Sequence, residues 1–122
     1  MFEETKVIQT YERPWGTYTN LEGGDHGPCK VKKIVVYPGA KLSLQKHKHR
    51  SEHWTIVKGC GIVQLGENRI PVERNSRIYI EKEEIHRMEN TGSELLEFIE
   101  VQIGEYLGED DIERIEDIYG RA

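Results

Sequence analysis

The sequence lacks the segments that would place it in a membrane or outside the cell. It has no apolar run near 18 residues, and its N-terminus shows no pattern of a secretory signal peptide. It holds two cysteines, Cys29 and Cys60, without C-x-x-C spacing. We therefore expect a cytoplasmic protein without a membrane partner, in which both thiols are reduced and not joined in a disulfide.

Acidic residues are absent from the stretch between Lys30 and Arg50, which carries seven lysines and arginines. The balance reverses between Glu94 and Asp117, where ten acids stand beside a single base, Arg114. A basic stretch favours an anionic ligand such as a phosphate, although a solvated strand face balanced by the acidic tail fits equally well. Nucleic acid is a poor fit as a partner, because the net charge is −5 and no recognised reader motif is present.

The chain also lacks linkers, low-complexity segments and internal repeats, and its 122 residues suit one domain. Turn signals such as Pro38-Gly39, Gly66-Glu67-Asn68 and Asn90-Thr91-Gly92 separate short segments rich in β-branched residues. Spacing of about ten residues between such segments predicts an all-β sandwich or barrel. We expect strands over residues 30–37, 42–49, 54–58, 62–65, 70–73, 76–80, 85–88 and 95–103.

One segment departs from the strand pattern. Acidic residues crowd the start of Glu109–Tyr119, and Ile112, Ile115 and Ile118 or Tyr119 recur three to four residues apart. This pattern is typical of a short amphipathic helix. We therefore expect a single domain over residues 1–122, with an N-terminal arm over about 1–12, a barrel over about 13–104 and a helical tail over about 105–122.

The most informative residues are potential metal ligands. On the expected strand, Gln45, His47 and His49 alternate and so project from one face. Glu52 follows a short break, and His86 can join them only if the sheet folds back on itself. Imidazole, amide oxygen and carboxylate are groups that bind divalent transition metals, although an inward Gln is also commonly a hydrogen-bonded core amide. The sequence predicts a metal site inside a small β-barrel.

The spacing of these residues resembles the motifs of the cupin superfamily. Gln45 stands where the first cupin motif usually has its first histidine. The second motif is matched in part by His86 and Asn90, because the proline and glycine expected before them are Glu81 and Glu83. The residues that keep the spacing of the first motif are Gly39, Gln45, His47, Glu52 and Gly59.

More specifically, the chain resembles the type II mannose-6-phosphate isomerase (phosphomannose isomerase) domain. That cupin is found fused behind a GDP-mannose pyrophosphorylase or standing alone. In the first matching segment we expect Arg13 and Trp15 to close one end of the barrel by packing. The matching segments cover nearly the whole chain from Arg13 onward: residues 13–16, 42–54, 75–80, 86–90, 99–102, 104–112 and 117–121.

The resemblance implies an all-β fold, a single cupin barrel (double-stranded β-helix or jelly roll) with a short C-terminal helix. It implies a metal-dependent isomerase that interconverts mannose 6-phosphate and fructose 6-phosphate through an enediolate, within GDP-mannose biosynthesis. A mixed nitrogen and oxygen donor set suits Zn²⁺, our first expectation, and also Mn²⁺, Co²⁺, Ni²⁺ or Fe²⁺. The implied metal ligands are Gln45, His47, Glu52 and His86.

Such a reaction also needs a base near the carbon acid, a group that stabilises the developing oxyanion, and an anchor for the phosphate. His49 is the first candidate for proton transfer, because imidazole titrates near neutrality and would lie beside the metal. Glu100 is the second, provided that the last strand turns it inward, which its ambiguous alternation leaves open. Arg50 is a candidate for catalysis. Candidates for binding the phosphate are Arg50 and Arg87, with Lys32 or Lys30 as alternatives.

Two other classes of function remain open. One barrel supports many chemistries, so a sugar epimerase or a metal-dependent dioxygenase is possible, although Gln45 in place of a histidine argues against the dioxygenase. The other class is a non-catalytic module that binds a sugar phosphate or sugar nucleotide. The altered turn at Glu81 and Glu83, which presents His86, keeps that class open. We further expect a homodimer, because small barrels of this kind often pair through sheet edges.

Overall fold

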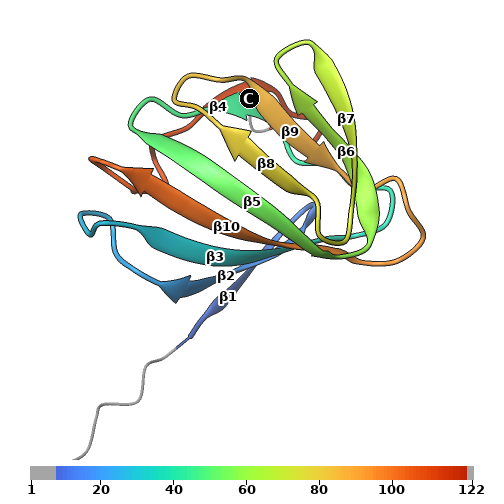
Figure 1. Cartoon of the computed structure of the whole chain (residues 1–122), viewed down its shortest axis with the longest axis horizontal. Helices are drawn as coiled ribbons and strands as arrows, with labels where there is room; N and C mark the ends of the chain where they lie inside the picture. The colour runs from blue at the N-terminus through green and yellow to red at the C-terminus, as the bar shows by residue number, and fades with distance from the viewer. Residues whose placement is uncertain (1–7, 121–122) are drawn as a thin grey trace, which may run out of the picture.

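A computed structural model describes residues 8–120, which form eleven strands and no helix. The strands make two antiparallel sheets, as Figure 1 shows. The six-stranded sheet has the order β1-β2-β3-β10-β5-β8, and the five-stranded sheet has the order β11-β4-β9-β6-β7. The strands are β1 (Thr10–Arg13), β2 (Gly16–Glu22), β3 (Lys30–Val36), β4 (Leu44–Lys46), β5 (Arg50–Lys58), β6 (Cys60–Leu65), β7 (Asn68–Glu73), β8 (Arg77–Ile80), β9 (His86–Glu89), β10 (Leu96–Gly104) and β11 (Glu113–Glu116).

The hydrophobic core lies between the two sheets. Alternate residues of each long strand are buried, as expected for strands that cover a core on one face. The Trp54 and Phe98 rings, 4.7 Å apart, belong to this core on the side of the six-stranded sheet. Val63, Val72 and Met88 contribute from the five-stranded sheet. The expectation of an all-β fold is confirmed.

The inward faces of β3, β5 and β10 are apolar at one end and polar at the other. Toward the apolar end, Phe98 lies opposite Ile34 on one neighbouring strand and Ile56 on the other. Toward the polar end, the antiparallel register places other inward-facing residues opposite one another. These cross-strand pairs are Glu100 with Lys32 and Trp54, and Gln102 with Lys30 and Glu52. The register of three strands therefore gathers charged groups at one end of the interior.

Two expected turns are present, with glycine where the backbone needs it. Ala40 N donates to Tyr37 O at 3.0 Å, and Gly39 has φ 78° after Pro38, which fits a type II turn. Gly66, with φ 58°, opens the two-residue connection between β6 and β7. Each expected strand has a counterpart, but the strand expected over residues 42–49 covers only residues 44–46, and β5 starts at residue 50 and not at residue 54. The first two strands, over residues 10–13 and 16–22, were not expected.

The expected C-terminal helix is wrong. Residues 113–116 form β11, an edge strand whose Glu113 pairs with Lys46 of β4. Two causes explain the difference. Like-charged acids three or four residues apart destabilise a helix that would be marginal at this length, and β4 offers an edge of unpaired backbone groups. Ile115 and Ile118 remain 43% and 57% exposed, so the apolar spacing does not create a buried face.

Three sequence expectations concern the chain more broadly. Cys29 and Cys60 are both free, as expected. Over residues 8–120, no helix is long and apolar enough to cross a membrane. Residues 1–7 of the expected N-terminal arm and residues 121–122 of the tail lie outside the described part of the chain.

Candidate metal centre and its cavity

Three of the four predicted metal ligands converge at the polar end of the interior. His47 follows β4, Glu52 lies on β5 and His86 begins β9, and all three side chains are buried. One possible ligand atom from each lies within 4.8 Å of the others. Their spacing and burial are those of a preformed site for a divalent cation.

Both imidazoles are oriented by backbone carbonyl groups. Nδ1 of His47 donates to Asp111 O at 2.6 Å, and Nδ1 of His86 donates to Glu84 O at 2.8 Å. Each Nε2 therefore carries the lone pair that a metal ligand needs. Nε2 of His86 is buried and has no hydrogen-bond partner, which is costly for a polar atom unless something binds there. The donor set and this unpaired nitrogen fit a divalent metal ion.

Burial and neighbouring charges keep His47 and Glu52 in the protonation states that bind a metal. Burial, together with the positive charge of Arg50, lowers the pKa of His47 to about 3, so its ring is neutral at pH 7. Burial alone would raise the pKa of Glu52. The charge of Arg50 and its hydrogen bond to the carboxylate outweigh burial and hold the pKa of Glu52 below its ordinary value. Arg50 Nε donates to Glu52 Oε2 at 2.8 Å, and Trp54 Nε1 donates to Oε1 at 2.9 Å.

Glu100 is the opposite case, a buried carboxyl whose pKa lies above its ordinary value. Burial and the negative charge of Glu52 raise the pKa of Glu100. Trp54 Nε1 donates to Glu100 Oε1 at 3.1 Å, and Gln102 donates to Oε2 at 2.6 Å. The structure resolves the ambiguous alternation of β10, because Glu100 and Gln102 both point inward. Two neighbouring carboxyls whose pKa values move apart are a common basis for acid–base chemistry.

A cavity of about 140 Å³ adjoins this centre and is partly open to solvent. His47 forms part of its wall, as do Gln45 and Glu100. The wall also has an aromatic part, made by Trp15 and Tyr18. Four cationic side chains line the cavity, which suits an anionic ligand: Arg13, Lys32, Arg50 and Arg114.

Gln45 lies next to the buried group without joining it in a hydrogen bond. It pairs with His86 across β4 and β9, and its Oε1 accepts from Ser43 Oγ at 2.9 Å. Its role as a fourth ligand therefore stays a prediction. Glu83, where the cupin motif has glycine, adopts φ 67°, and its N–H donates to His47 O at 2.7 Å. The turn that presents His86 thus keeps a left-handed residue despite the substitution.

Two candidates for catalysis or substrate binding lie away from the cavity. The expectation that His49 shares a face with His47 is wrong, because the His49 side chain is 46% exposed and its Nδ1 bonds Glu105 at 2.8 Å. The strand ends at Lys46, and the chain then bends, so the alternation is lost. Arg87 is buried but points to the tail, where it donates to Leu42 O at 3.0 Å and to Glu116 Oε1 at 3.1 Å.

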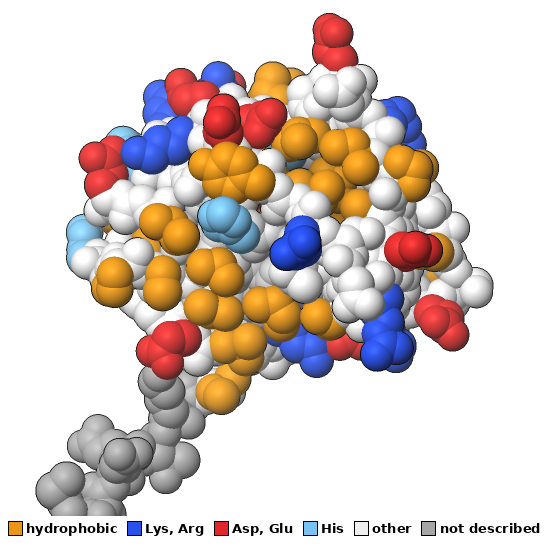
Figure 2. Space-filling model, in the orientation of Figure 1, with side chains coloured by type: hydrophobic (Ala, Val, Ile, Leu, Met, Phe, Trp, Pro, Cys, Tyr) orange, Lys and Arg blue, Asp and Glu red, His pale blue; other side chains and the backbone are white. Residues whose placement is uncertain are grey.

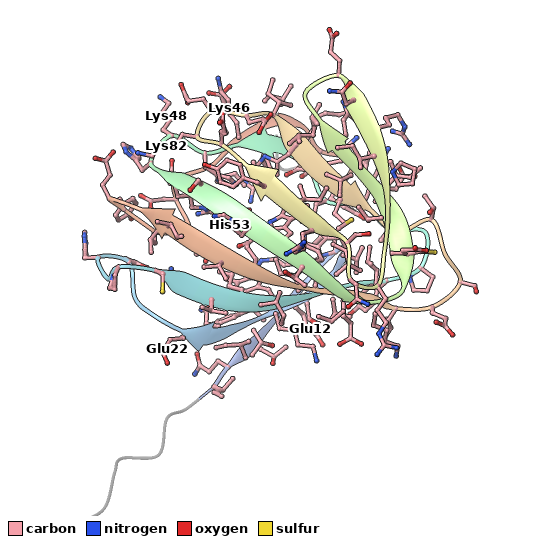
Figure 3. All side chains as sticks on the ribbon, viewed as in Figure 1. Glu12, Glu22, Lys46, Lys48, His53 and Lys82 are labelled. Carbon is pink, nitrogen blue, oxygen red and sulfur yellow. The ribbon has the colours of Figure 1, made fainter. Side chains whose placement is uncertain are left out.

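The basic stretch between residues 30 and 50 is divided by the fold. Lys32 and Arg50 are buried beside the cavity, as two of the predicted phosphate-binding residues. Lys46 and Lys48 line a separate surface pocket together with His49. Figure 3 shows Lys46, Lys48 and Lys82 at one end of the molecule, at its upper left. The sequence stretch is therefore not a single basic surface.

Several cavity residues were not predicted as functional. Arg13 and Trp15 were expected only to pack, and Tyr18, Glu109 and Arg114 were given no role. The available signal was weak, namely that Arg13, Trp15 and Glu109 fall in the segments that resemble the isomerase domain. Strands and loops far apart in sequence bring these side chains to one cavity, so local spacing does not reveal them.

Comparison with known proteins agrees with this geometry. The family model described as "Mannose-6-phosphate isomerase C-terminal" matches residues 2–117. The chain belongs to this family. The chain is 53% identical over 120 residues to the alginate biosynthesis protein AlgA of Pseudomonas syringae pv. tomato. It is 42% identical over 119 residues to a mannose-1-phosphate guanylyltransferase of Escherichia coli.

Each of these two alignments covers 98% of this chain and 24% of the relative, so the chain spans about a quarter of either protein. Among solved structures, a protein with a double-stranded β-helix domain from Klebsiella pneumoniae superposes with a TM-score of 0.75. That match covers 93% of this chain and 100% of the other at 15% identity, and it concerns the fold alone. The fold is a cupin barrel, as expected.

Proposed function

We propose that this member of the family is a metal-dependent aldose–ketose isomerase that interconverts mannose 6-phosphate and fructose 6-phosphate. The observation that carries the proposal is the position of Glu100. It is a buried carboxyl with a raised pKa, in the wall of a cation-lined cavity and beside a preformed group of metal ligands. A base, a Lewis-acid site and an anion site within one cavity are what this isomerisation requires.

Isomerisation moves a proton between C1 and C2 through an enediolate. We assign this transfer to the Glu100 carboxyl, because it lines the cavity and because its raised pKa makes its carboxylate a stronger base than an ordinary one. This replaces the earlier choice of His49, whose ring lies outside the cavity. Trp54 and Gln102 hold the carboxyl in place through the hydrogen bonds that they donate to it.

The remaining residues bind and orient the sugar. A divalent metal held by His47, Glu52 and His86, with Gln45 as the proposed fourth ligand and Zn²⁺ as our first choice, would supply Lewis-acid polarisation of the sugar carbonyl when bound. Arg50 is fixed by Glu52 and keeps Nη1 without a protein partner, so it is available to donate to a sugar oxygen. Lys32 lines the same cavity and offers its charge to the phosphate.

The test is turnover of mannose 6-phosphate to fructose 6-phosphate by chelated protein, repeated after addition of Zn²⁺, Mn²⁺, Co²⁺ or Ni²⁺. We expect no activity in the chelated protein and recovery with at least one metal. Absence of turnover with every metal, while sugar phosphate still binds, would contradict the isomerase. That result would favour the non-catalytic binding module.

We also propose that the chain acts in the cytoplasm as a homodimer. Sequence reasoning placed the contact at a sheet edge, and β1, β8 and β7 are edges of the two sheets. Figure 2 shows hydrophobic side chains gathered on the outer face of the six-stranded sheet, where Val57, Tyr79 and Ile103 are exposed. A monomer in light scattering at micromolar concentration would contradict the dimer.

A further inference from the structure

The segment after β10 contributes Glu109 and Ile112 to the wall of the cavity, and it is anchored on both sides of Glu109. Before Glu109, the fully buried Leu107 donates its N–H to Asp25 O at 2.8 Å, and its carbonyl accepts from Lys30 Nζ at 2.6 Å. After Glu109, the Asp111 carboxylate accepts from the N–H groups of Lys48 and His49, both at 2.9 Å. Glu109 takes part in neither set of hydrogen bonds, although its carboxylate lies 4.0 Å from Lys30 Nζ, and its side chain is half exposed.

Glu109 is the counter-charge of a buried lysine. The Lys32 side chain is 5% exposed, its Nζ lies 4.5 Å from the centre of the Tyr18 ring, and it forms an ion pair with Glu109. Lys30 differs, because it has Asp25 at 2.8 Å and lies 4.0 Å from Glu109. A buried ammonium group requires an anion close by. Within residues 8–120, Glu109 is the carboxylate that forms an ion pair with Lys32.

Two further cations of the cavity have no carboxylate partner among the described residues. Arg13 donates to Tyr18 Oη at 3.0 Å, and its guanidinium lies 4.9 Å from the centre of the Tyr18 ring. The buried Nε of Arg114 has no hydrogen-bond partner. With Lys32, these side chains give three positive charges against the single charge of Glu109 on this part of the wall. A phosphate, with a charge of about −1.5 to −2 and three acceptor oxygens, matches this excess better than one carboxylate does.

We infer that Glu109 is an internal stand-in for the phosphate group of the substrate, an inference that rests on the proposed function. The phosphate subsite is formed by Lys32, Arg13 and Arg114. The Glu109 carboxylate stays paired with Lys32 until a phosphate takes the place of that carboxylate. Because the hydrogen bonds at Leu107 and Asp111 do not involve Glu109, its side chain can swing outward while the Asp111 carbonyl continues to hold His47. A neutral sugar cannot displace the carboxylate, so the subsite selects phosphorylated sugars.

The test measures the binding of inorganic phosphate to chelated protein by titration calorimetry, without any turnover. Replacing Glu109→Gln removes the internal competitor, and we expect phosphate to bind about three to ten times more tightly. Glu113→Gln is the matched control. It removes the same charge from the same exposed tail, but residue 113 does not line the cavity, so phosphate affinity should stay within twofold of the unmodified protein.

A third variant tests the subsite itself. Adding Arg114→Gln to Glu109→Gln should return phosphate affinity to the level of the unmodified protein or below it. Unchanged or weaker binding in Glu109→Gln would overturn the inference, as would an equal gain in Glu113→Gln. Because the readout is phosphate affinity, the inference can fail while the isomerase stands. Conversely, phosphate binding with the expected pattern and no isomerisation would refute only the proposed reaction.

Discussion

The buried ligand group and the C-terminal tail meet at the same cavity, but different forces hold them there. His47, Glu52 and His86 are placed by strand register and oriented by hydrogen bonds inside the barrel. The tail has one short edge strand and is tied mainly by charged groups, such as the ion pairs of Lys32 with Glu109 and Arg87 with Glu116. The comparison separates a centre that is built by strand register from a tail that is held largely by its charged side chains.

The largest effect should come from Glu52→Gln, which removes the only formal negative charge among the four predicted ligands. We expect the barrel to fold but to retain less than about a tenth of the metal after dialysis, because a neutral amide binds divalent cations poorly. The free energy of unfolding of the chelated protein should fall by about 3 kcal/mol, since Arg50 becomes an unpaired buried charge. Elemental analysis and urea unfolding measure the two effects.

The matched control for this variant is Glu67→Gln, in the exposed turn between β6 and β7. It should change neither metal content nor the unfolding midpoint. If metal content is the same in Glu52→Gln and in the control, Glu52 is not a ligand, and the centre must lie elsewhere.

Glu100→Gln should leave metal binding intact and remove proton transfer. We expect kcat for mannose 6-phosphate to fall by about 10²–10⁴, the usual contribution of a general acid–base group. Glu97→Gln, on the outward face of the same strand, should retain activity within about twofold, since residue 97 pairs with Lys33 and Lys58 outside the barrel. A fully active Glu100→Gln enzyme would remove Glu100 from the mechanism.

Sequence reasoning found the interior group because its signals are local and periodic. Strand alternation pointed to His47, and the spacing of the cupin motifs pointed to Glu52 and His86, which lie on different elements. The same reasoning failed at His49. It assumed that the strand continued through residue 49, but the Asp111 carboxylate accepts the N–H groups of Lys48 and His49 and bends the chain there. The residues near position 48 give no sign that Asp111, more than 60 positions away, accepts their backbone N–H groups.

The tail was harder to predict for a related reason. Its apolar spacing suggested a helix, yet its conformation depends on the free edge of β4 and on cations elsewhere in the fold. The cation-lined part of the cavity is also beyond local patterns, because Arg13, Lys32 and Arg114 come from three separate strands, β1, β3 and β11. The excess of basic residues between Lys30 and Arg50 indicated an anionic ligand, but it did not show where that ligand would bind.

The ligand group should make the chelated protein sensitive to acid. The pKa of His47 is about 3 in the folded protein and near 6.5 in the unfolded chain, so the unfolded chain binds more protons between these values. The free energy of unfolding should therefore fall as pH drops from 6.5 toward 3, with His47 contributing up to about 1.4 kcal/mol per pH unit. Glu100, whose pKa is raised, acts in the opposite direction above its ordinary pKa.

The difference between the unmodified protein and His47→Gln isolates the histidine, because Glu100 is present in both. We expect urea unfolding from pH 4 to pH 7 to show a shallower loss of stability toward low pH in His47→Gln. Parallel pH profiles would mean that His47 titrates normally in the folded protein and is not buried as a neutral ring.

The smallest effect should come from Asp111→Ala, at the point where the tail and the ligand group are joined. The Asp111 carboxylate holds the bend after β4, and its own carbonyl accepts from His47 Nδ1. Without the carboxylate the carbonyl loses its fixed position, and we expect metal affinity to fall about tenfold, as is usual when a group that orients a ligand is disturbed. Asp110→Ala, which removes an exposed neighbour bonded to Tyr106, should leave metal affinity unchanged. Equal metal affinities in the two variants would show that the ligand group is held by the strands alone and that the tail only covers it.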